Sequence, residues 1–395
     1  MKVLGIEDGR RDRIVPGQPS PLVCHAADHR IQTLMRYLPE PQARPGRDAA
    51  TAILLVNLGT PDAPTAPAVR RYLRQFLSDS RVIEIPRAVW LPLLYGLVLT
   101  IRPIKSAKKY ASIWSPEGSP LKVHTSRQAS LLRRRFESQR QPPITVEFAM
   151  RYGEPSIPGV LLRLKAEGCE RVLVIPLYPQ FAASTTASAL DEIARFVQRA
   201  RNVPEIRVVK HFFDDPAYIR ALANLVQQHW RKSGRPDRLV MSFHGLPHYT
   251  IERGDPYHAE CMKTARLLAE ELALSAEQWQ IAFQSRFGRT EWIKPYTASA
   301  LADCGSRGMR VDVVCPGFVA DCLETLEEIG IEGKMLFQRS GGKEFHLLPC
   351  LNERDDWIGA LEAIARRHLS GWLNPPADPG PAQNLPEIVE ERAQT

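Results

Sequence analysis

The segment Leu239-Val-Met-Ser-Phe-His-Gly-Leu-Pro247 joins a short apolar run to an abrupt ending. The apolar run predicts a buried strand, which Gly245 and Pro247 terminate. We therefore expect His244 at the C-terminal mouth of a strand, where open α/β sheets bind their ligands. An imidazole there can take up a proton or ligate a borderline metal ion near neutral pH. A hydrogen-bonded loop histidine is the alternative, and position alone leaves both interpretations open.

A second segment with candidate functional residues is Cys315-Pro-Gly-Phe-Val-Ala-Asp-Cys-Leu-Glu-Thr-Leu-Glu-Glu-Ile-Gly330, which predicts a strand end, a loop and a helix. Helical spacing puts Glu324 and Glu328 on one face, a turn apart. Asp321 falls where an N-cap is expected. A structural interpretation is equally available, because Asp321 and Glu324 fit a capping box and Glu328 could be a solvated surface residue.

Length and composition indicate a soluble globular protein. The chain has 395 residues, enough for two α/β domains of ordinary size, and is 44% hydrophobic and 24% charged. The net charge of +8 suits an anionic small substrate or an anionic membrane surface. No nucleic-acid-binding motif accompanies the basic residues, so we expect no nucleic-acid partner.

The seven cysteines are scattered and show no CxxC spacing. This pattern argues against a disulfide framework, a zinc finger and a cysteine-held iron–sulfur cluster, and favours the reducing cytoplasm. Residues 1–47 are polar and proline-rich, without the pattern of a signal peptide, and we predict a disordered N-terminal extension. Residues 374–395 are predicted to form a disordered tail.

One apolar run, residues 89–101, lies between Arg87 on one side and Arg102 and Lys105 on the other. It is too short and too interrupted to be expected to span a bilayer. Either it forms a core helix, or residues 87–103 form an exposed apolar lip that contacts a membrane surface or an apolar ligand.

Strand-like runs alternate with helical patterns along the chain. This alternation predicts an α/β fold with parallel sheets and right-handed crossovers. The expected strands are residues 53–58, 146–150, 171–176, 206–212, 239–243, 280–284 and 310–315. The expected helices are residues 66–77, 126–138, 158–167, 190–201, 216–232, 260–272, 323–329 and 356–368.

The chain also shows weak internal similarity, in the same order in both halves. Leu55-Val-Asn-Leu-Gly-Thr-Pro61 parallels Val240-Met-Ser-Phe-His-Gly-Leu-Pro247, Phe148-Ala-Met-Arg-Tyr-Gly153 parallels Phe283-Gln-Ser-Arg-Phe-Gly288, and Arg171-Val-Leu-Val-Ile-Pro176 parallels Arg310-Val-Asp-Val-Val-Cys-Pro316. We therefore expect two similar Rossmann-like domains, residues 48–186 and 187–373, facing each other across a cleft. Arg151 and the two clusters above would line that cleft.

Taken together, these segments resemble the ferrochelatase family from about residue 53 to residue 373. The resemblance is carried by the segments quoted above, the Gly118-Ser-Pro120 turn, Tyr178-Pro-Gln-Phe with Ser184-Thr-Thr186, Trp292, and the series Phe318, Asp321, Glu324 and Glu328. It implies two Rossmann-like (chelatase-type) domains around a porphyrin cleft.

The resemblance also implies roles for individual residues. His244 matches the active-site histidine and Glu324 the acidic residue opposite it, and these two would contact the metal. Glu328 and Asp321 match an acidic path leading away. Three residues match positions that contact the macrocycle (Leu58, Trp292 and Phe318), and four match positions that line the pocket or lie near the propionates (Ser126, Arg151, Tyr152 and Gln284).

The implied reaction is insertion of Fe²⁺ into protoporphyrin IX, with release of two protons, to give protohaem in the terminal step of haem biosynthesis. Such an enzyme must release its metal, and one histidine with one glutamate makes an open, weak site. We expect no permanently bound cofactor, since Ala183 replaces a cysteine that ligates an iron–sulfur cluster in animal relatives. Cys322 stands where some relatives have a second histidine. We expect a cytoplasmic protein that contacts the inner membrane peripherally through residues 87–103.

Other functions remain open at this stage. A related chelatase could insert cobalt into sirohydrochlorin or iron into coproporphyrin, although the former enzymes usually have more histidines in the site. A haem carrier could use His244 as an axial ligand, but would have no need of Glu324 and Glu328. A hydrolase is excluded, because the chain lacks both the G-x-S-x-G and the HExxH pattern.

Overall fold

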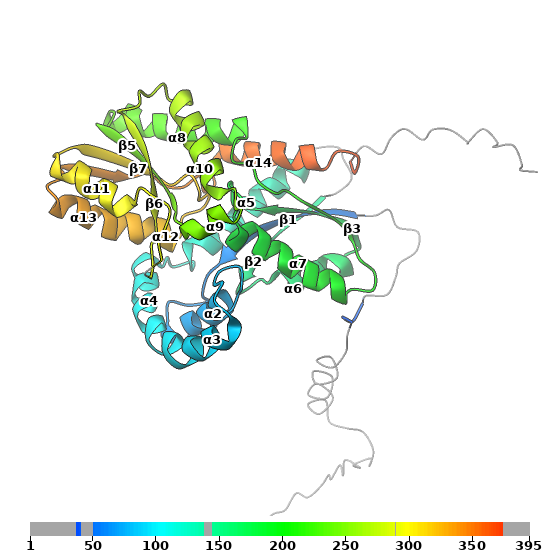
Figure 1. Ribbon diagram of the computed structural model, residues 1–395. Coiled ribbons are helices and arrows are strands. Elements are labelled where there is room, and N and C mark those ends of the chain that lie inside the picture. The colour runs from blue at the N-terminus through cyan, green and yellow to red at the C-terminus, as the bar shows by residue number, and fades with distance from the viewer. Residues whose placement is uncertain (1–36, 41–49, 138–143, 289, 374–395) are drawn as a thin grey trace, which may run out of the picture.

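The structure is a computed structural model that describes residues 37–40, 50–137, 144–288 and 290–373 (Figure 1). Most of the predicted disordered extension and the whole predicted tail lie outside these residues. Residues 37–40 are the exception, because they contact the first domain. The Leu38 N–H donates to the carbonyl of Arg199 at 2.8 Å, and the Glu40 carboxylate pairs with Lys165. The prediction of disorder is therefore wrong for this short segment.

The first sheet has four parallel strands in the order β2-β1-β3-β4. Strand β1, one of its two inner strands, is buried on both sides: Ile53 and Leu55 face one apolar core, and Leu54 and Val56 face another. This is the burial expected of a parallel strand covered by helices. The strands are β1 (Ala50–Gly59), β2 (Ile144–Tyr152), β3 (Cys169–Pro176) and β4 (Glu205–Val208). The helices in this half are α2 (Ala66–Leu77), α3 (Arg87–Leu93), η1 (Leu94–Val98), α4 (Leu99–Ile113), α5 (Pro120–Glu137), α6 (Ile157–Ala166), η2 (Ala183–Ala187) and α7 (Ser188–Arg199).

The second sheet is also parallel and has the order β6-β5-β7-β8. Its strands are β5 (Arg238–His244), β6 (Trp279–Gln284), β7 (Arg310–Val314) and β8 (Glu344–Leu347). The helices in this half are α8 (Pro216–Ser233), α9 (His248–Glu252), α10 (Tyr257–Glu271), α11 (Thr297–Ser306), α12 (Leu323–Leu326), η3 (Glu328–Gly333), α13 (Lys334–Arg339) and α14 (Asp355–His368).

The strand orders confirm the predicted α/β fold with two similar domains. In each sheet the first strand of that half lies between the second and the third, and the fourth strand forms the edge beside the third. The three pairs of similar segments fall on equivalent strands, namely β1 with β5, β2 with β6, and β3 with β7. Because β4 pairs with β3, the first sheet extends to residue 208. A boundary between β4 and β5 therefore fits the sheets better than the predicted one at residues 186 and 187.

The two halves are joined by packing as well as by the chain. One apolar core contains residues of β1, α5, β5, α8 and α14, so it runs across both sheets. Polar contacts from α5 reinforce it. The buried Gln128 amide donates to the carbonyls of Val319 and Asn352 at 2.8 and 2.9 Å, and His124 Nδ1 lies 2.8 Å from a carboxylate oxygen of Glu353.

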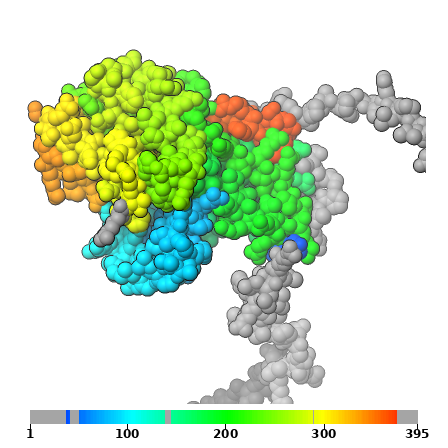
Figure 2. Space-filling view, in the orientation of Figure 1, coloured from blue at the N-terminus to red at the C-terminus, as the bar shows by residue number. Residues whose placement is uncertain are grey.

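The apolar run forms part of a continuous helical segment, Arg87–Ile113, that is long and apolar enough to cross a membrane, and only 22% of an apolar 18-residue window within it is buried. The core-helix interpretation is therefore wrong. Trp90, Leu94 and Tyr110 attach the segment to the first domain. In Figure 2 it belongs to the blue and cyan lobe below the second domain. The exposed apolar side chains are Val89, Leu93, Tyr95, Leu97, Ile101 and Ile104, each between 44% and 65% accessible.

Candidate active site

His244 is the last residue of β5, as predicted from the end of the apolar run. Its ring is partly buried, and Nδ1 lies 2.6 Å from the carbonyl oxygen of Gly245. A carbonyl oxygen only accepts hydrogen bonds, so Nδ1 carries a ring hydrogen, and in the neutral imidazole the lone pair is on Nε2. In its neutral form the ring therefore has the tautomer that a proton acceptor or a metal ligand at Nε2 requires.

Gly245 allows Trp292 to pack beside this histidine. A Cβ atom at Gly245 would lie 2.7 Å from the Gln284 carbonyl oxygen and 3.0 Å from the Trp292 ring. The ring centroids of His244 and Trp292 are 6.5 Å apart, and Trp292 is only 8% exposed. The more accessible aromatic ring is that of Phe287, which is 52% exposed and meets Trp292 edge to face.

Glu328 is held by the residue that follows β6. The Ser285 N–H donates to Oε1 at 2.6 Å, and the Ser285 hydroxyl donates to Oε2 at 2.5 Å. Ser285 adopts a φ of 67°, in the left-handed region. Burial raises the pKa of the Glu328 carboxyl above its ordinary value, and the negative charge of Glu324 adds to the rise. The Ser285 hydrogen bonds and the nearby His244 offset it only in part, so this carboxyl binds a proton more readily than an exposed one.

Glu324 connects this group of residues to the first domain. Burial, with the Glu324 negative charge as a smaller contribution, raises the pKa values of Tyr72 and Tyr110, which come from α2 and α4. The backbone carbonyl of Glu324 accepts a hydrogen bond from the Gln284 amide at 2.7 Å. Gln284 is buried and is itself fixed by the Ser242 hydroxyl at 2.6 Å. Gln284 therefore attaches α12 to the end of β6.

The predicted capping box of Asp321 and Glu324 is wrong. The N-cap of α12 is Cys322, which forms the box with Thr325. The Asp321 carboxylate instead accepts hydrogen bonds from the Cys350 N–H at 2.9 Å and from the Asn352 side chain at 2.7 Å. Asp321 is buried, and these bonds join its loop to the segment after β8.

Arg151 and Tyr152, predicted to lie near the propionates, are engaged by protein groups. The Arg151 guanidinium contacts one Asp79 oxygen at 2.6 Å and a Glu192 oxygen at 3.4 Å, and its Nε donates to Ser188. The Tyr152 hydroxyl donates to Asp79 at 2.8 Å. Burial alone would raise the pKa of Asp79, but its hydrogen bonds, chiefly from Ser188, and the Arg151 charge lower it. Within this group the Arg151 guanidinium and the Asp79 carboxylate neutralise each other, so we interpret the group as a structural ion pair.

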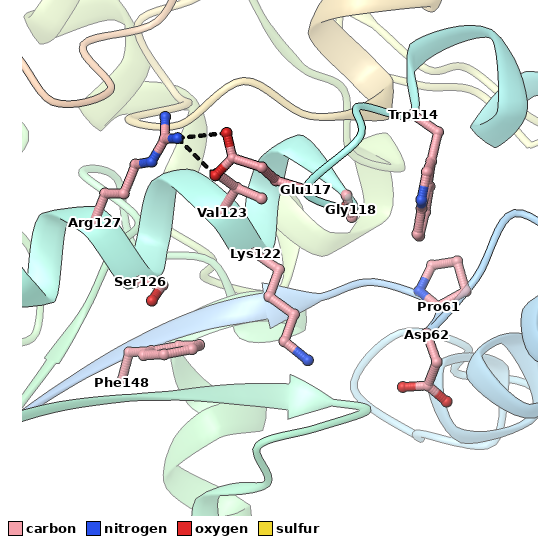
Figure 3. A pocket seen from close by; sticks show the side chains of 11 residues that line it. Pro61, Asp62, Trp114, Glu117, Gly118, Lys122, Val123, Ser126, Arg127 and Phe148 are labelled. Carbon is pink, nitrogen blue, oxygen red and sulfur yellow. Dashed lines mark hydrogen bonds and ion pairs between the residues drawn. The ribbon is translucent and has the colours of Figure 1, made fainter.

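Ser126 lines a cavity of about 390 Å³ in the first domain. Figure 3 shows Lys122 and Ser126 projecting from α5 toward β2, with Phe148 opposite. Arg127 on the same helix makes two 2.7 Å contacts with Glu117. Within the described residues, Lys122 is therefore the cation of this cavity that no carboxylate neutralises.

Leu58 and Phe318 also occupy defined places. Leu58 packs on the apolar cluster that holds the lip, and this cluster also touches Leu323 at the start of α12. Phe318 packs between the core of the second sheet and Leu121. Of the predicted site residues, the structure brings His244, Glu324, Glu328, Gln284 and Trp292 into one group. Arg151, Tyr152, Ser126 and Asp321 have other surroundings.

Sequence reasoning missed several neighbours of this group. Ser285 and Phe287 stand inside the quoted Gln284–Gly288 motif, so their position directly after a strand could have marked them. Arg102 lies 5.4 Å over the Phe287 ring and brings the lip to the site. Tyr72 and Tyr110 come from distant helices, and no sequence pattern connects them to Glu324.

Comparison with known proteins gives a consistent family. The model of the Ferrochelatase family matches residues 50–369. A ferrochelatase of Aromatoleum aromaticum is 57% identical over 363 residues, 92% of this chain and 99% of the relative. A ferrochelatase of Azoarcus sp. is 60% identical over 87% of this chain and 95% of the relative, and one of Dechloromonas aromatica is 60% identical over 85% and 93%.

Among solved structures, SirB from Bacillus subtilis with Fe³⁺ aligns with a TM-score of 0.48 and 16% identity, covering 82% of this chain and 97% of that one. The parallel strand orders, and not this likeness, establish the two-sheet fold. The match over residues 50–369 and the identity to these relatives show that the chain belongs to the ferrochelatase family, enzymes that insert a metal into a porphyrin for haem synthesis.

Proposed function

We propose that this enzyme inserts Fe²⁺ into protoporphyrin IX, releasing both pyrrole N–H protons and giving protohaem. The observation that carries the proposal is the arrangement around β5: the Nδ1 hydrogen bond of His244 makes Nε2 the proton-accepting nitrogen of the neutral ring, and Glu328 lies within electrostatic range of both His244 and Glu324. In this proposal His244 accepts a pyrrole proton. Glu324 faces the incoming metal, and Glu328, whose pKa is raised, passes a proton on.

The surroundings favour an apolar tetrapyrrole with few carboxylates. Phe287 offers accessible apolar surface beside Trp292, and the partly buried Leu58 belongs to the apolar cluster that reaches α12. The guanidinium groups of Arg151 and Arg127 are already paired with protein carboxylates. Because four substrate carboxylates would need more free cations than two, we propose protoporphyrin over coproporphyrin, with Lys122 as a candidate partner for one carboxylate.

The decisive experiment is an anaerobic assay in which purified protein, porphyrin and Fe²⁺ are mixed and porphyrin fluorescence is followed. The native chain should consume protoporphyrin, and faster than coproporphyrin. His244→Ala should be slower by about 10²–10⁴-fold, the usual contribution of a general base, while still binding porphyrin. His248→Ala, an exposed histidine four residues on, is the matched control. Tight porphyrin binding without insertion by the native chain would contradict the proposal and indicate a carrier.

We also propose that the lip attaches this enzyme peripherally to the cytoplasmic face of the inner membrane. Its exposed apolar side chains lie near the exposed Lys105 and Lys108, which suits contact with anionic lipid. The native chain should co-sediment with anionic vesicles, and a Leu97→Glu, Ile104→Glu double variant should not. Val203→Glu, which changes an exposed apolar residue elsewhere, should bind as the native chain does. Equal binding by the double variant would exclude the lip as the contact.

The remaining proposals concern absences. We propose that the enzyme works without a resident iron–sulfur cluster and without a nucleic-acid partner. Acid-labile sulfide in the purified, active protein should be far below one equivalent. A stoichiometric amount of sulfide together with iron would contradict the absence of a cluster.

A further inference from the structure

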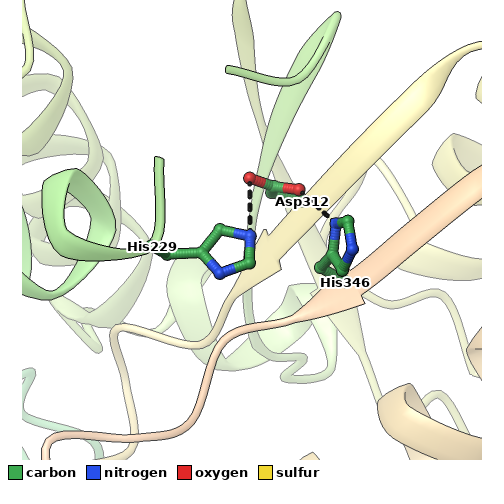
Figure 4. A group of neighbouring side chains, drawn as sticks. All are labelled: His229, Asp312 and His346. Carbon is green, nitrogen blue, oxygen red and sulfur yellow. Dashed lines mark hydrogen bonds and ion pairs between the residues drawn. The ribbon is translucent and has the colours of Figure 1, made fainter. Parts of the chain in front are cut away.

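Three side chains with metal-binding chemistry meet at a place that the proposed reaction does not use. They are His229 on α8, Asp312 on β7 and His346 on β8 (Figure 4). His229 Nε2 lies 3.4 Å from Asp312 Oδ2, and His346 Nδ1 lies 3.1 Å from Asp312 Oδ1. All three potential ligand atoms lie within 4.8 Å of one another.

This group is separate from the His244 site. Asp312 pairs with Leu239 at the beginning of β5, whereas His244 ends that strand. Five residues of extended strand span about 16 Å, at about 3.3 Å per residue. The two groups therefore lie toward opposite ends of the same sheet.

The carboxylate of Asp312 needs a positive partner. Asp312 is fully buried, and within the described residues its ion-pair partners are the two imidazoles, without a lysine or arginine. Burying an uncompensated carboxylate is very costly, so a cation or a proton must neutralise it. His229 Nε2 is also buried and has no hydrogen-bond partner, which leaves a nitrogen directed at this carboxylate without a bond of its own.

The distances suit a small divalent cation. An ion that holds ligands tetrahedrally at about 2.0–2.1 Å spaces the ligand atoms about 3.4 Å apart. The two nitrogen–oxygen separations, 3.4 and 3.1 Å, are of that size, and each imidazole faces a different oxygen of Asp312, so both carboxylate oxygens would take part in holding one ion. Two imidazoles with one carboxylate form a donor set of borderline softness, which suits Zn²⁺ or Fe²⁺ better than Mg²⁺ or Ca²⁺.

The neighbours of the ligands would orient them. The Trp230 indole donates to Asp312 Oδ2 at 2.9 Å, and His346 Nε2 lies 3.3 Å from a Glu344 oxygen. A carboxylate on the far nitrogen of a histidine is the usual support of a metal-bound imidazole. The imidazoles are 23% and 30% exposed, so an ion can reach the group from solvent and water can complete its coordination.

We propose that His229, Asp312 and His346 form a second metal site, which binds Zn²⁺ or a similar borderline divalent cation and joins α8 to β7 and β8. This site would hold its ion and stabilise the second domain, in contrast to the open site of the reaction. The alternative is a shared proton, in which a charged imidazole neutralises Asp312 and no metal binds.

The test is metal binding by the full chain after treatment with a chelator. Equilibrium dialysis with Zn²⁺ should give one equivalent more for the native chain than for His346→Gln or His229→Gln. His368→Gln, which removes a histidine outside the group, should bind as the native chain does. Glu344→Gln should weaken binding by about 10–100-fold, as loss of a supporting carboxylate usually does.

Thermal unfolding supplies a second readout that does not depend on turnover. Zn²⁺ should raise the Tm of the native chain and of His244→Ala, because ligand binding to the folded state stabilises it. It should not raise the Tm of His346→Gln or His229→Gln. If these two variants fold and bind as much Zn²⁺ as the native chain, the second site is excluded and the shared proton remains. Either result is distinct from failure of the insertion assay, which depends on His244.

Discussion

Two carboxylates, the buried Asp79 and the partly buried Glu328, lie in different halves of the molecule and have pKa values shifted in opposite directions. Asp79 interacts with the end of β2, and Glu328 with the residue after the equivalent strand β6. Asp79 has a guanidinium partner and a lowered pKa, whereas Glu328 accepts its hydrogen bonds, among the described residues, from Ser285 alone and has a raised pKa. The same architecture therefore carries a structural ion pair in one half and a group ready to take up a proton in the other.

The largest expected effect on stability comes from breaking the ion pair between Asp79 and Arg151. Asp79→Asn removes the closer of the two carboxylates that pair with the buried Arg151 side chain and leaves only the 3.4 Å contact with Glu192, so it should lower the free energy of unfolding by about 3 kcal/mol. Urea denaturation measures this, and Asp191→Asn at the exposed pair with Arg81 should cost about 1 kcal/mol or less. Because the pKa of Asp79 is lowered in the folded state, its contribution is present above about pH 3.9 and is lost as the pH falls through the folded pKa. If Asp79→Asn lowers the free energy of unfolding no more than Asp191→Asn does, Asp79 is not a stabilising ion-pair partner and the contrast with Glu328 fails.

In the second half, Glu324→Gln removes a charge that acts on Glu328 and leaves the hydrogen bond from Gln284 to the Glu324 carbonyl intact. We expect insertion about 10²-fold slower, equivalent to about 2.7 kcal/mol in the barrier, with little change in Tm. Single-turnover fluorescence and thermal unfolding measure the two quantities. A large loss of Tm with normal turnover would assign Glu324 to structure, as for Asp79.

Gly245→Ala tests whether the close packing beside His244 is needed. The added methyl group meets Gln284 and Trp292 at short distances, so we expect a cost of about 1–3 kcal/mol and slower insertion because the imidazole shifts. Gly96→Ala in the lip meets open space and should not be destabilising. Unchanged stability and turnover in Gly245→Ala would show that the site tolerates displacement.

The smallest effect is the pH dependence of Glu328→Gln. A carboxyl with a raised pKa keeps its proton in the folded state, so the native chain loses stability as the pH rises from about 4.3, the ordinary value, to the raised one. The variant lacks this loss, so its unfolding free energy relative to the native chain should increase across that interval. Denaturation at several pH values measures it. In Ser285→Ala, which loses a hydrogen bond that lowers the pKa, the interval should extend to higher pH. A pH-independent difference would contradict the raised pKa.

The helices and strands that the sequence predicted well are those with strong local patterns. Short strand-like runs marked seven of the strands, and their alternation with helical patterns predicted parallel sheets. The edge strand β8 was missed, because its four residues, including His346, lack a continuous apolar run. The lip was predicted too short, because prolines at 92 and 103 normally end helices, whereas here the helical segment continues through both.

The site was predicted only in part for a related reason. His244, Glu324 and Glu328 follow from a strand end and from helical spacing, which are local. The sequence could not reveal that Arg151 is neutralised by Asp79, 72 residues away, or that Asp321 bonds to Asn352. Nor could it reveal that three residues from α8, β7 and β8 meet around one buried carboxylate.

The sequence by itself determined the parallel α/β fold, the duplication and the histidine at the end of β5, because periodicity and chain-breaking residues act over a few neighbours. Only the tertiary structure decided which ionisable groups are satisfied and which remain available. Charge compensation and desolvation depend on distances between residues far apart in the chain, and these distances exist only after folding.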